Sequence, residues 1–261
     1  KYEELKQLYI MARKKILTRS ASNMYYPEEY RDKSDFVVDL SKNGWISKQA
    51  LENKKLITYS NKLTTLLVNI TLFLDQKHVV FTFFKEKAGA NLIYSLLKLA
   101  GINAAVFSGD SSDSERNHIL RVYNDPKNRN GELLKVLIIT EAGSEGISIL
   151  EARHIHLLES GPRMNRILQA IGRVARFKSH IHLPENERNV RVWKYWSVVG
   201  ANPVKIKTTY INPEGETVSV EKIIEDKPDT EDVVLDREGQ IVMNTNNSFL
   251  ELLQSASSTK F

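Results

Sequence analysis

The sequence of 261 residues contains no cysteine, and it has no apolar run long enough to span a bilayer. Without cysteine, disulfide bonds and thiolate metal sites are excluded. The longest apolar stretch, residues 70–84, is interrupted by four polar residues, Asp75 to His78, so no membrane-spanning helix is predicted. Nothing at the start resembles a cleaved signal sequence. These features predict an intracellular, cytoplasmic protein.

Charge is present but unevenly distributed. The net charge is only +5, yet residues 163–194 hold eight Lys or Arg against two acids. Residues 214–238 reverse this ratio, with ten acids against three basic residues. A basic segment suits a polyanion such as a nucleotide or nucleic acid, while an acidic one suits solvent or a basic partner. A solvated surface explains the acidic segment equally well.

Three sections follow from the sequence pattern. Residues 1–61 have interrupted helical patterns and predict a helical lead-in. Residues 62–199 alternate continuous apolar runs with helical patterns, which is typical of a parallel sheet covered by helices on both faces. Residues 200–261 predict an irregular acidic extension, with a hairpin around residues 213–215 and then a flexible tail. The expected fold class is therefore α/β, with a doubly wound parallel sheet.

The central section is expected to contain five strands and four helices. The predicted strands cover residues 79–84, 104–107, 135–140, 154–158 and 190–198, and the predicted helices cover residues 63–74, 87–99, 114–123 and 164–176.

The predicted helix 164–176 has the residue types that can bind a phosphate. At helical spacing, Gln169, Gly172, Arg173 and Arg176 share one face, and apolar residues supply the other. A glycine inside a helix costs about 1 kcal/mol relative to alanine, so Gly172 suggests that something approaches the backbone there. An exposed basic helix face is the alternative interpretation.

Three loops that follow predicted strands contain small or hydroxyl residues. Because ligands bind outside the carboxyl ends of parallel strands, function is expected in these loops. Thr82 lies at the end of the first strand, Ser108-Gly109 follows the second, and Thr140 begins a loop with Gly143, Glu145 and Gly146. Glycines at such positions permit tight turns that expose backbone amides to a ligand.

Together these segments have an order that resembles the second RecA-like lobe of superfamily 2 helicases and translocases. Residues 79–84 look like motif IV, and residues 107–110 with Arg116 and residues 123–125 resemble the segment that follows it in the chromatin-remodelling branch. Residues 140–147 are similar to motif V. Residues 169–176 match motif VI, Gln-x-x-Gly-Arg-x-x-Arg, without a mismatch. The resemblance covers residues 62–199.

The residues after motif VI resemble a viral branch of this family. Remodelling enzymes usually continue with Gly-Gln, whereas this chain has Phe177-Lys178-Ser179-His180. That is similar to the nucleoside triphosphatase and early transcription factor helicases of poxviruses and other large DNA viruses. The resemblance therefore implies viral transcription or genome handling, in a cytoplasmic viral factory or a virion, with the nucleus left open.

The resemblance also implies a role for each candidate residue. In this family two lobes sandwich ATP, and the second lobe supplies arginines that stabilise charge on the transferring phosphate. It implies that Arg173 and Arg176 are catalytic arginine fingers. It further implies nucleotide contacts and nucleic-acid backbone contacts, made respectively by Gln169, Gly143, Glu145, Gly146 and Gly172, and by Thr82, Ser108, Gly109 and Thr140.

The chain lacks the motifs of the complementary lobe. No Gly-x-x-x-x-Gly-Lys-Ser/Thr loop and no Asp-Glu-x-His box occurs in it. We therefore expect ATP and Mg²⁺ to be held mainly by an N-terminal RecA-like lobe of the same protein. The chain starts with Lys1 rather than methionine, so it is expected to be a fragment, inactive alone.

The expected partner is DNA, with RNA left open, and transcription machinery is a further candidate. One alternative is a non-catalytic DNA-clamping subunit of a transcription factor, and another is the translocase of a restriction or repair enzyme. A metabolic α/β enzyme with a chance Gly-Arg helix is the weakest alternative. The pairs His154/His156 and His180/His182 lack nearby cysteine or an acidic cluster, so no metal site is predicted.

Overall fold

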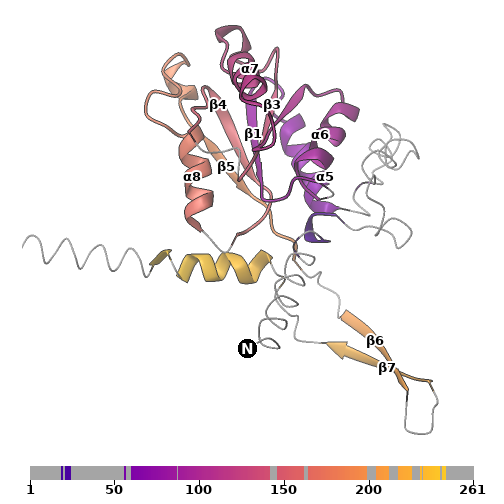
Figure 1. Ribbon diagram of the computed structural model, residues 1–261. Helices are drawn as coiled ribbons and strands as arrows, with labels where there is room; N and C mark the ends of the chain where they lie inside the picture. Colours follow the sequence, from indigo (N-terminus) through magenta and orange to yellow (C-terminus); the bar gives the residue numbers. More distant parts are fainter. Residues whose placement is uncertain are drawn as a thin grey trace, which may run out of the picture.

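The computed structural model contains a five-stranded sheet whose neighbouring strands all run parallel (Figure 1). The strands are β1 (Lys77–Thr82), β2 (Ala104–Phe107), β3 (Val136–Thr140), β4 (Ala152–Leu157) and β5 (Arg191–Lys194), in the order β2-β3-β1-β4-β5. The structure describes residues 19, 21–24, 56, 60–86, 88–141, 146–161, 164–198, 204–211, 217–224, 230, 232–241 and 243–244.

Helices cover both faces of this sheet. The four are α5 (Asn61–Thr71), α6 (Ala90–Leu99), α7 (Asp113–Tyr123) and α8 (Met164–Val174). Val80 of β1 packs in a cluster with α5 and α6, whereas its neighbours Val79 and Phe81 pack in a second cluster with α7 and α8. Successive side chains of a strand point to opposite faces, so β1 belongs to both cores. The predicted doubly wound α/β fold is confirmed.

The boundaries of several elements differ from the prediction by a few residues. The first strand begins at Lys77 rather than at residue 79, since Lys77 and His78 are themselves buried in the sheet. Helix α6 begins at Ala90 rather than at residue 87. Gly89 is its N-cap, and a Cβ atom there would overlap the carbonyl of Phe84, so the chain turns tightly before the helix starts.

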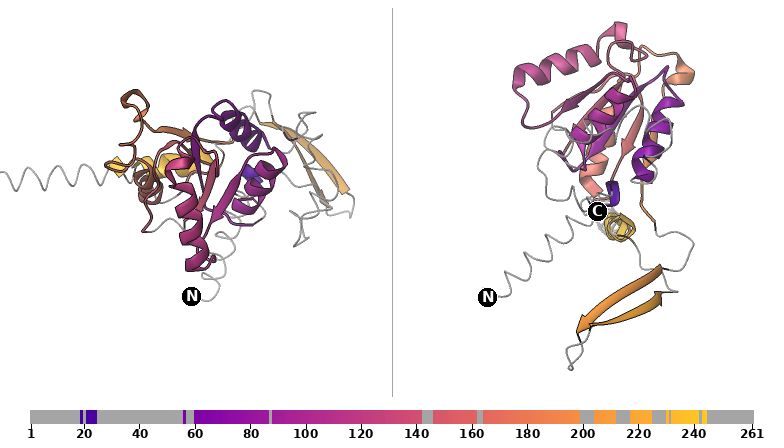
Figure 2. Two further views of the ribbon diagram at one scale, coloured as in Figure 1. Left: turned by 90° about the horizontal axis from the view of Figure 1, so that it is seen from above. Right: turned by 90° about the vertical axis from the view of Figure 1, so that its right-hand side faces the viewer.

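The described part of the C-terminal section, residues 200–261, includes a hairpin and a helix. The predicted hairpin is present, with β6 (Val204–Ile211) antiparallel to β7 (Thr217–Ile224). Where a flexible tail is predicted, residues 232–241 are helical. Figures 1 and 2 show this helix, in yellow, below the end of the sheet at which α8 begins. The rest of the predicted lead-in and tail lies outside the described residues.

Buried polar contacts join both end sections to the sheet domain. Asp232 at the start of the C-terminal helix pairs with Lys62 of α5 at 2.6 Å, and both side chains are buried. Lys62 also donates to the amide oxygen of Asn23, whose own amide nitrogen donates to Glu159 beyond β4. Because an unpaired buried charge is costly, these contacts fix the C-terminal helix beside α5. No helix in the described part of the chain is long and apolar enough to cross a membrane.

Candidate nucleotide and nucleic-acid sites

Helix α8 presents the predicted polar face to solvent. Ile167, Ala170 and Val174 are buried in the core, while Gln169 and Gly172 are exposed. A Cβ atom added to Gly172 would meet no heavy atom within 4 Å. The backbone of α8 is therefore open at this glycine, so a ligand has room to approach it.

The two candidate arginines meet the loop that precedes β4. Arg176, just past the end of α8, donates from Nη1 to the hydroxyl of Ser148 at 2.6 Å. The backbone amide of Ile149 donates to the carbonyl of Arg173 at 3.2 Å. Gly146 begins this loop with φ +75°, a left-handed conformation that suits glycine. Arg173, through its backbone, and Arg176, through its side chain, thus both contact the loop that contains Gly146.

Two further predicted nucleotide contacts, Gly143 and Glu145, lie outside the described residues. Ser148 was not among the predicted residues. Its signal in the sequence is weak, because a serine two residues after a glycine is common in loops, and only the contact with Arg176 distinguishes it.

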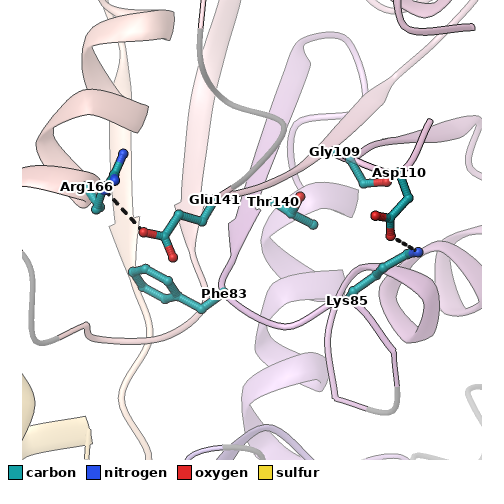
Figure 3. Close-up of a pocket in the computed structure, with 8 residues that line it drawn as sticks. Phe83, Lys85, Gly109, Asp110, Thr140, Glu141 and Arg166 are labelled. Atoms are coloured by element: carbon teal, nitrogen blue, oxygen red, sulfur yellow. Dashed lines mark hydrogen bonds and ion pairs between the residues drawn. The ribbon is translucent and has the colours of Figure 1, made fainter. Parts of the chain in front are cut away.

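A separate pocket of about 410 Å³ lies at the carboxyl ends of β1, β2 and β3 (Figure 3). Three of the predicted nucleic-acid contacts line it: Ser108, Gly109 and Thr140. The sequence prediction missed five other lining residues, namely Phe83, Lys85, Asp110, Glu141 and Arg166. Four of them, Phe83, Lys85, Asp110 and Glu141, could have been found by the carboxyl-edge rule, since each lies within three residues of a strand end.

Thr82 does not line this pocket. It is fully buried, and its hydroxyl donates to the Glu159 carboxylate at 2.7 Å. The backbone amide of Phe83 donates to the other oxygen of Glu159 at 2.9 Å. Burial raises the pKa of Glu159, and these hydrogen bonds act against that rise. Thr82 therefore holds the ends of β1 and β4 together, and its contact with a nucleic-acid backbone stays a prediction.

The cations of the pocket are paired with acids. Lys85 forms an ion pair with Asp110, and its hydrogen bond to that carboxylate is the main cause of its raised pKa. Arg166 in the first turn of α8 contacts Glu141 at 3.2 Å, as Figure 3 shows. A phosphate entering the pocket would therefore compete with two carboxylates for these cations.

The pocket and the arginine pair lie at opposite ends of the sheet. Helix α8 follows β4 and returns beside it, so Arg166 is at the carboxyl edge while Arg173 reaches the loop before β4. Seven residues of helix separate them by roughly 10 Å along the axis. The predicted arginine pair and the pocket therefore lie at different edges of the sheet, because a helix antiparallel to β4 carries its last turn to the edge opposite its start.

Three of the four histidines in the two pairs, His154, His156 and His180, have protein partners. His156 Nε2 contacts His78 Nδ1 at 3.1 Å, and His154 Nε2 contacts Gln76 at 2.7 Å. His180 bonds the carbonyl of Ala152 at 2.7 Å. No group of three His, Cys, Asp or Glu suited to a metal occurs among the residues that the structure describes. The exposed guanidinium of Arg176 has the chemistry to bind a phosphate.

Comparison with known proteins relates the central section to a protein family. Residues 61–178 match the family model for the helicase conserved C-terminal domain. A protein of Acanthamoeba polyphaga mimivirus named "Putative ATP-dependent RNA helicase L538" is 36% identical over 112 residues, which are 43% of this chain and 24% of that protein. A termination factor NPH-I homolog of African swine fever virus is 27% identical over 187 residues, 72% of this chain and 24% of that protein.

Among solved structures, the C-terminal domain of the DEAD-box protein Dbp5 aligns with 52% of this chain and 71% of that chain, at 21% identity and a TM-score of 0.41. The chain spans about a quarter of the length of the two viral relatives. Residues 61–178 therefore match the helicase conserved C-terminal domain, and viral proteins named as helicases are among the relatives of the chain.

Proposed function

We propose that this domain is the second motor lobe of an ATP-dependent DNA helicase or translocase that acts in viral transcription or genome handling. The observation that carries the proposal is the contact of Arg176 with Ser148, which holds a guanidinium against the loop that contains Gly146, while the backbone of α8 is open at Gly172. Such an arrangement suits a polyphosphate, because planar and permanently charged forks match phosphate oxygens.

In the proposed reaction, an N-terminal lobe of the same protein holds ATP and Mg²⁺, and the metal would neutralise phosphate charge. When the lobes close, Arg173 and Arg176 approach the terminal phosphate and stabilise the charge that spreads over its oxygens. Gln169, one turn before Arg173 on the same exposed face, supplies a polar contact. Closure would also exclude water from these charges, which strengthens their attraction.

The pocket at the carboxyl edge is the proposed track for the nucleic-acid backbone. The hydroxyl residues Ser108 and Thr140 line it together with Lys85 and Arg166. Hydroxyl groups and cations are the usual partners of phosphate oxygens in such interfaces. Because α8 extends from this pocket to the arginine pair, a shift of α8 on ATP binding would move both sites together.

The test is steady-state ATPase activity of the full-length protein with nucleic acid present. Arg173→Ala and Arg176→Ala should each lower turnover by about 10³-fold or more, the range of arginine-finger losses. Arg188→Ala is the control, since Arg188 is an exposed arginine outside both sites. Folding should persist in all three variants by circular dichroism. Turnover at the wild-type rate in both site variants would contradict the proposal.

RNA is the second candidate for the nucleic acid, because the mimivirus relative is named an RNA helicase. The two candidates are distinguished by measuring how strongly DNA and RNA strands of the same sequence stimulate ATPase activity. Stronger stimulation by RNA would replace DNA in the proposal. Binding of either strand without any ATP turnover would favour a non-catalytic clamp.

A further inference from the structure

The loop that receives Arg176 is held from a second side by Asn124. The side-chain amide of Asn124 donates from Nδ2 to the carbonyl of Ser148 at 2.9 Å. Its Oδ1 accepts from the backbone amide of Leu150, also at 2.9 Å. One side chain thus spans the peptide groups on both sides of Ile149, as a neighbouring strand would.

On its other side, the same loop is bonded to the end of α8 and the turn that follows. The amide of Ile149 donates to the carbonyl of Arg173, and the amide of Glu151 donates to the carbonyl of Ser179 at 2.9 Å. Three successive amides, at residues 149, 150 and 151, are therefore bonded alternately to opposite sides. Ile149 is fully buried between them.

This double attachment has consequences for Ser148. The serine is exposed, and its hydroxyl accepts from Arg176. Its position depends on the hydrogen bonds that hold the loop to Asn124 on one side and to the end of α8 on the other. Three residues later the chain reaches Glu151, which has a left-handed φ of +58°. A non-glycine residue in that region is strained, so the loop keeps this shape only while its neighbours hold it.

Capping does not require the side chain of Asn124. Asn124 follows α7, and its backbone amide supplies the capping hydrogen bonds to Leu120 and Val122. The side chain serves the loop instead. An amide is the group that fits, since its nitrogen donates and its oxygen accepts, and both are bonded to the same carbon.

We propose that Asn124 is a positioning residue for the arginine finger Arg176, acting through the backbone of residues 148–150. This inference rests on the proposed function. By fixing Ser148, Asn124 holds the guanidinium of Arg176 in the direction from which it meets the terminal phosphate. Loss of the amide would leave Arg176 present but less often in place, which lowers turnover more than nucleotide binding.

The experiment measures kcat and KM for ATP in the full-length protein with saturating nucleic acid. The variants are Asn124→Ala, Asn124→Asp, Arg176→Ala and the double variant of Asn124→Ala with Arg176→Ala. Asn189→Ala is the matched control, because Asn189 also donates to a nearby carbonyl but lies on an exposed turn outside both sites.

We expect Asn124→Ala to lower kcat about tenfold or more with KM changed less than threefold. Asn124→Asp keeps the size of the side chain and the oxygen that accepts from Leu150. It replaces the donating nitrogen by a second oxygen, which cannot donate to the Ser148 carbonyl, so kcat should fall similarly. The double variant should be no slower than Arg176→Ala, because the effect of Asn124 passes through Arg176. Asn189→Ala should match wild type.

Three results would overturn the inference. Wild-type kcat in both Asn124 variants, while Arg176→Ala is impaired, rejects the role of Asn124 and leaves the proposed function intact. Multiplied losses in the double variant indicate a structural role unconnected with Arg176. Wild-type turnover in Arg176→Ala rejects the proposed function itself. If Asn124→Ala fails to fold by circular dichroism, the comparison rests on Asn124→Asp, to which the same outcomes apply.

Discussion

At the scale of single residues, the carboxyl-edge pocket is a site whose charges are partly neutralised. Lys85 is paired with Asp110, and both side chains are accessible to solvent. Exposed ion pairs contribute little to stability, so Asp110 can be changed with small effect on folding. Its effect should appear in binding, because Asp110 and a nucleic-acid phosphate compete for the same ammonium group.

We therefore predict opposite effects on nucleic-acid affinity from the two members of this pair. Lys85→Ala should weaken binding and reduce the slope of log K against log salt by about 0.7 to 0.9, the value for one phosphate contact. Asp110→Asn should strengthen binding severalfold. Fluorescence anisotropy over a salt series measures both. Lys127→Ala, at an exposed lysine outside the pocket, is the control, and equal slopes for it and Lys85→Ala would argue against a phosphate contact.

At the scale of an element, α8 has a buried apolar face and an exposed polar face. The exposed face contains a glycine, a residue that destabilises a helix. Gly172 lies within the helix, and a side chain there would meet no neighbour. Packing therefore does not explain the glycine. The proposed function offers a reason for its presence, namely close approach of a phosphate to the backbone.

We predict that Gly172→Ala raises stability and lowers activity. The free energy of unfolding should rise by up to about 1 kcal/mol, because alanine favours the helix. ATPase turnover should fall at least tenfold, since the methyl group would occupy the space proposed for phosphate. Gly101→Ala provides the contrast: Gly101 ends α6 at φ +74°, so alanine there should lower stability and leave turnover per folded molecule unchanged. Thermal unfolding measures the stability of both variants, and an ATPase assay measures their turnover. Full ATPase activity in Gly172→Ala would contradict the proposed approach of phosphate to Gly172.

At the scale of the whole molecule, three buried histidines lie across the centre of the sheet. His78 of β1 stacks on His154 of β4 with ring centroids 4.6 Å apart, and His156 stacks on Trp193 of β5 at 6.0 Å. Burial lowers the pKa of His78 to about 4 and that of His154 to about 3, and it also lowers the pKa of His156. All three are therefore neutral in the folded protein at pH 7.

This cluster makes stability depend on pH in a defined direction. In the unfolded chain each histidine has a pKa near 6.5, so below that pH the unfolded state binds protons that the folded state does not. The stability contributed by neutral burial is complete above pH 6.5 and is lost as the pH falls toward 4 and then 3. Each histidine contributes a slope of at most about 1.4 kcal/mol per pH unit.

We predict that His78→Gln lowers the slope of the free energy of unfolding against pH by the contribution of one proton, about 1.4 kcal/mol per pH unit. Glutamine keeps a donor and an acceptor but does not titrate in this range. Denaturant unfolding at several pH values between 4 and 7.5 gives the slope. His118→Gln, at an exposed histidine of α7, should leave it unchanged. The same slope in His78→Gln as in wild type would show that His78 is not the source.

Local patterns in the sequence were enough to predict the layers of the fold and the exposed face of α8. The apolar run of β3 is buried along its whole length, and the spacing of Gln169 and Gly172 places both on the solvent side. Strand limits were less predictable, because Lys77 is buried by contacts with Tyr123 and Glu151 that lie far away in the sequence.

By itself the sequence determined which residues share a face, since helix and strand periodicities depend only on the local backbone. Tertiary structure decided which faces meet. Arg176 and Ser148 are 28 residues apart, and Thr82 and Glu159 are 77 apart, so their contacts depend on how α8 and β4 pack. That packing separates the arginine pair from the pocket at Ser108 and Thr140, because an antiparallel helix joins opposite edges of the sheet.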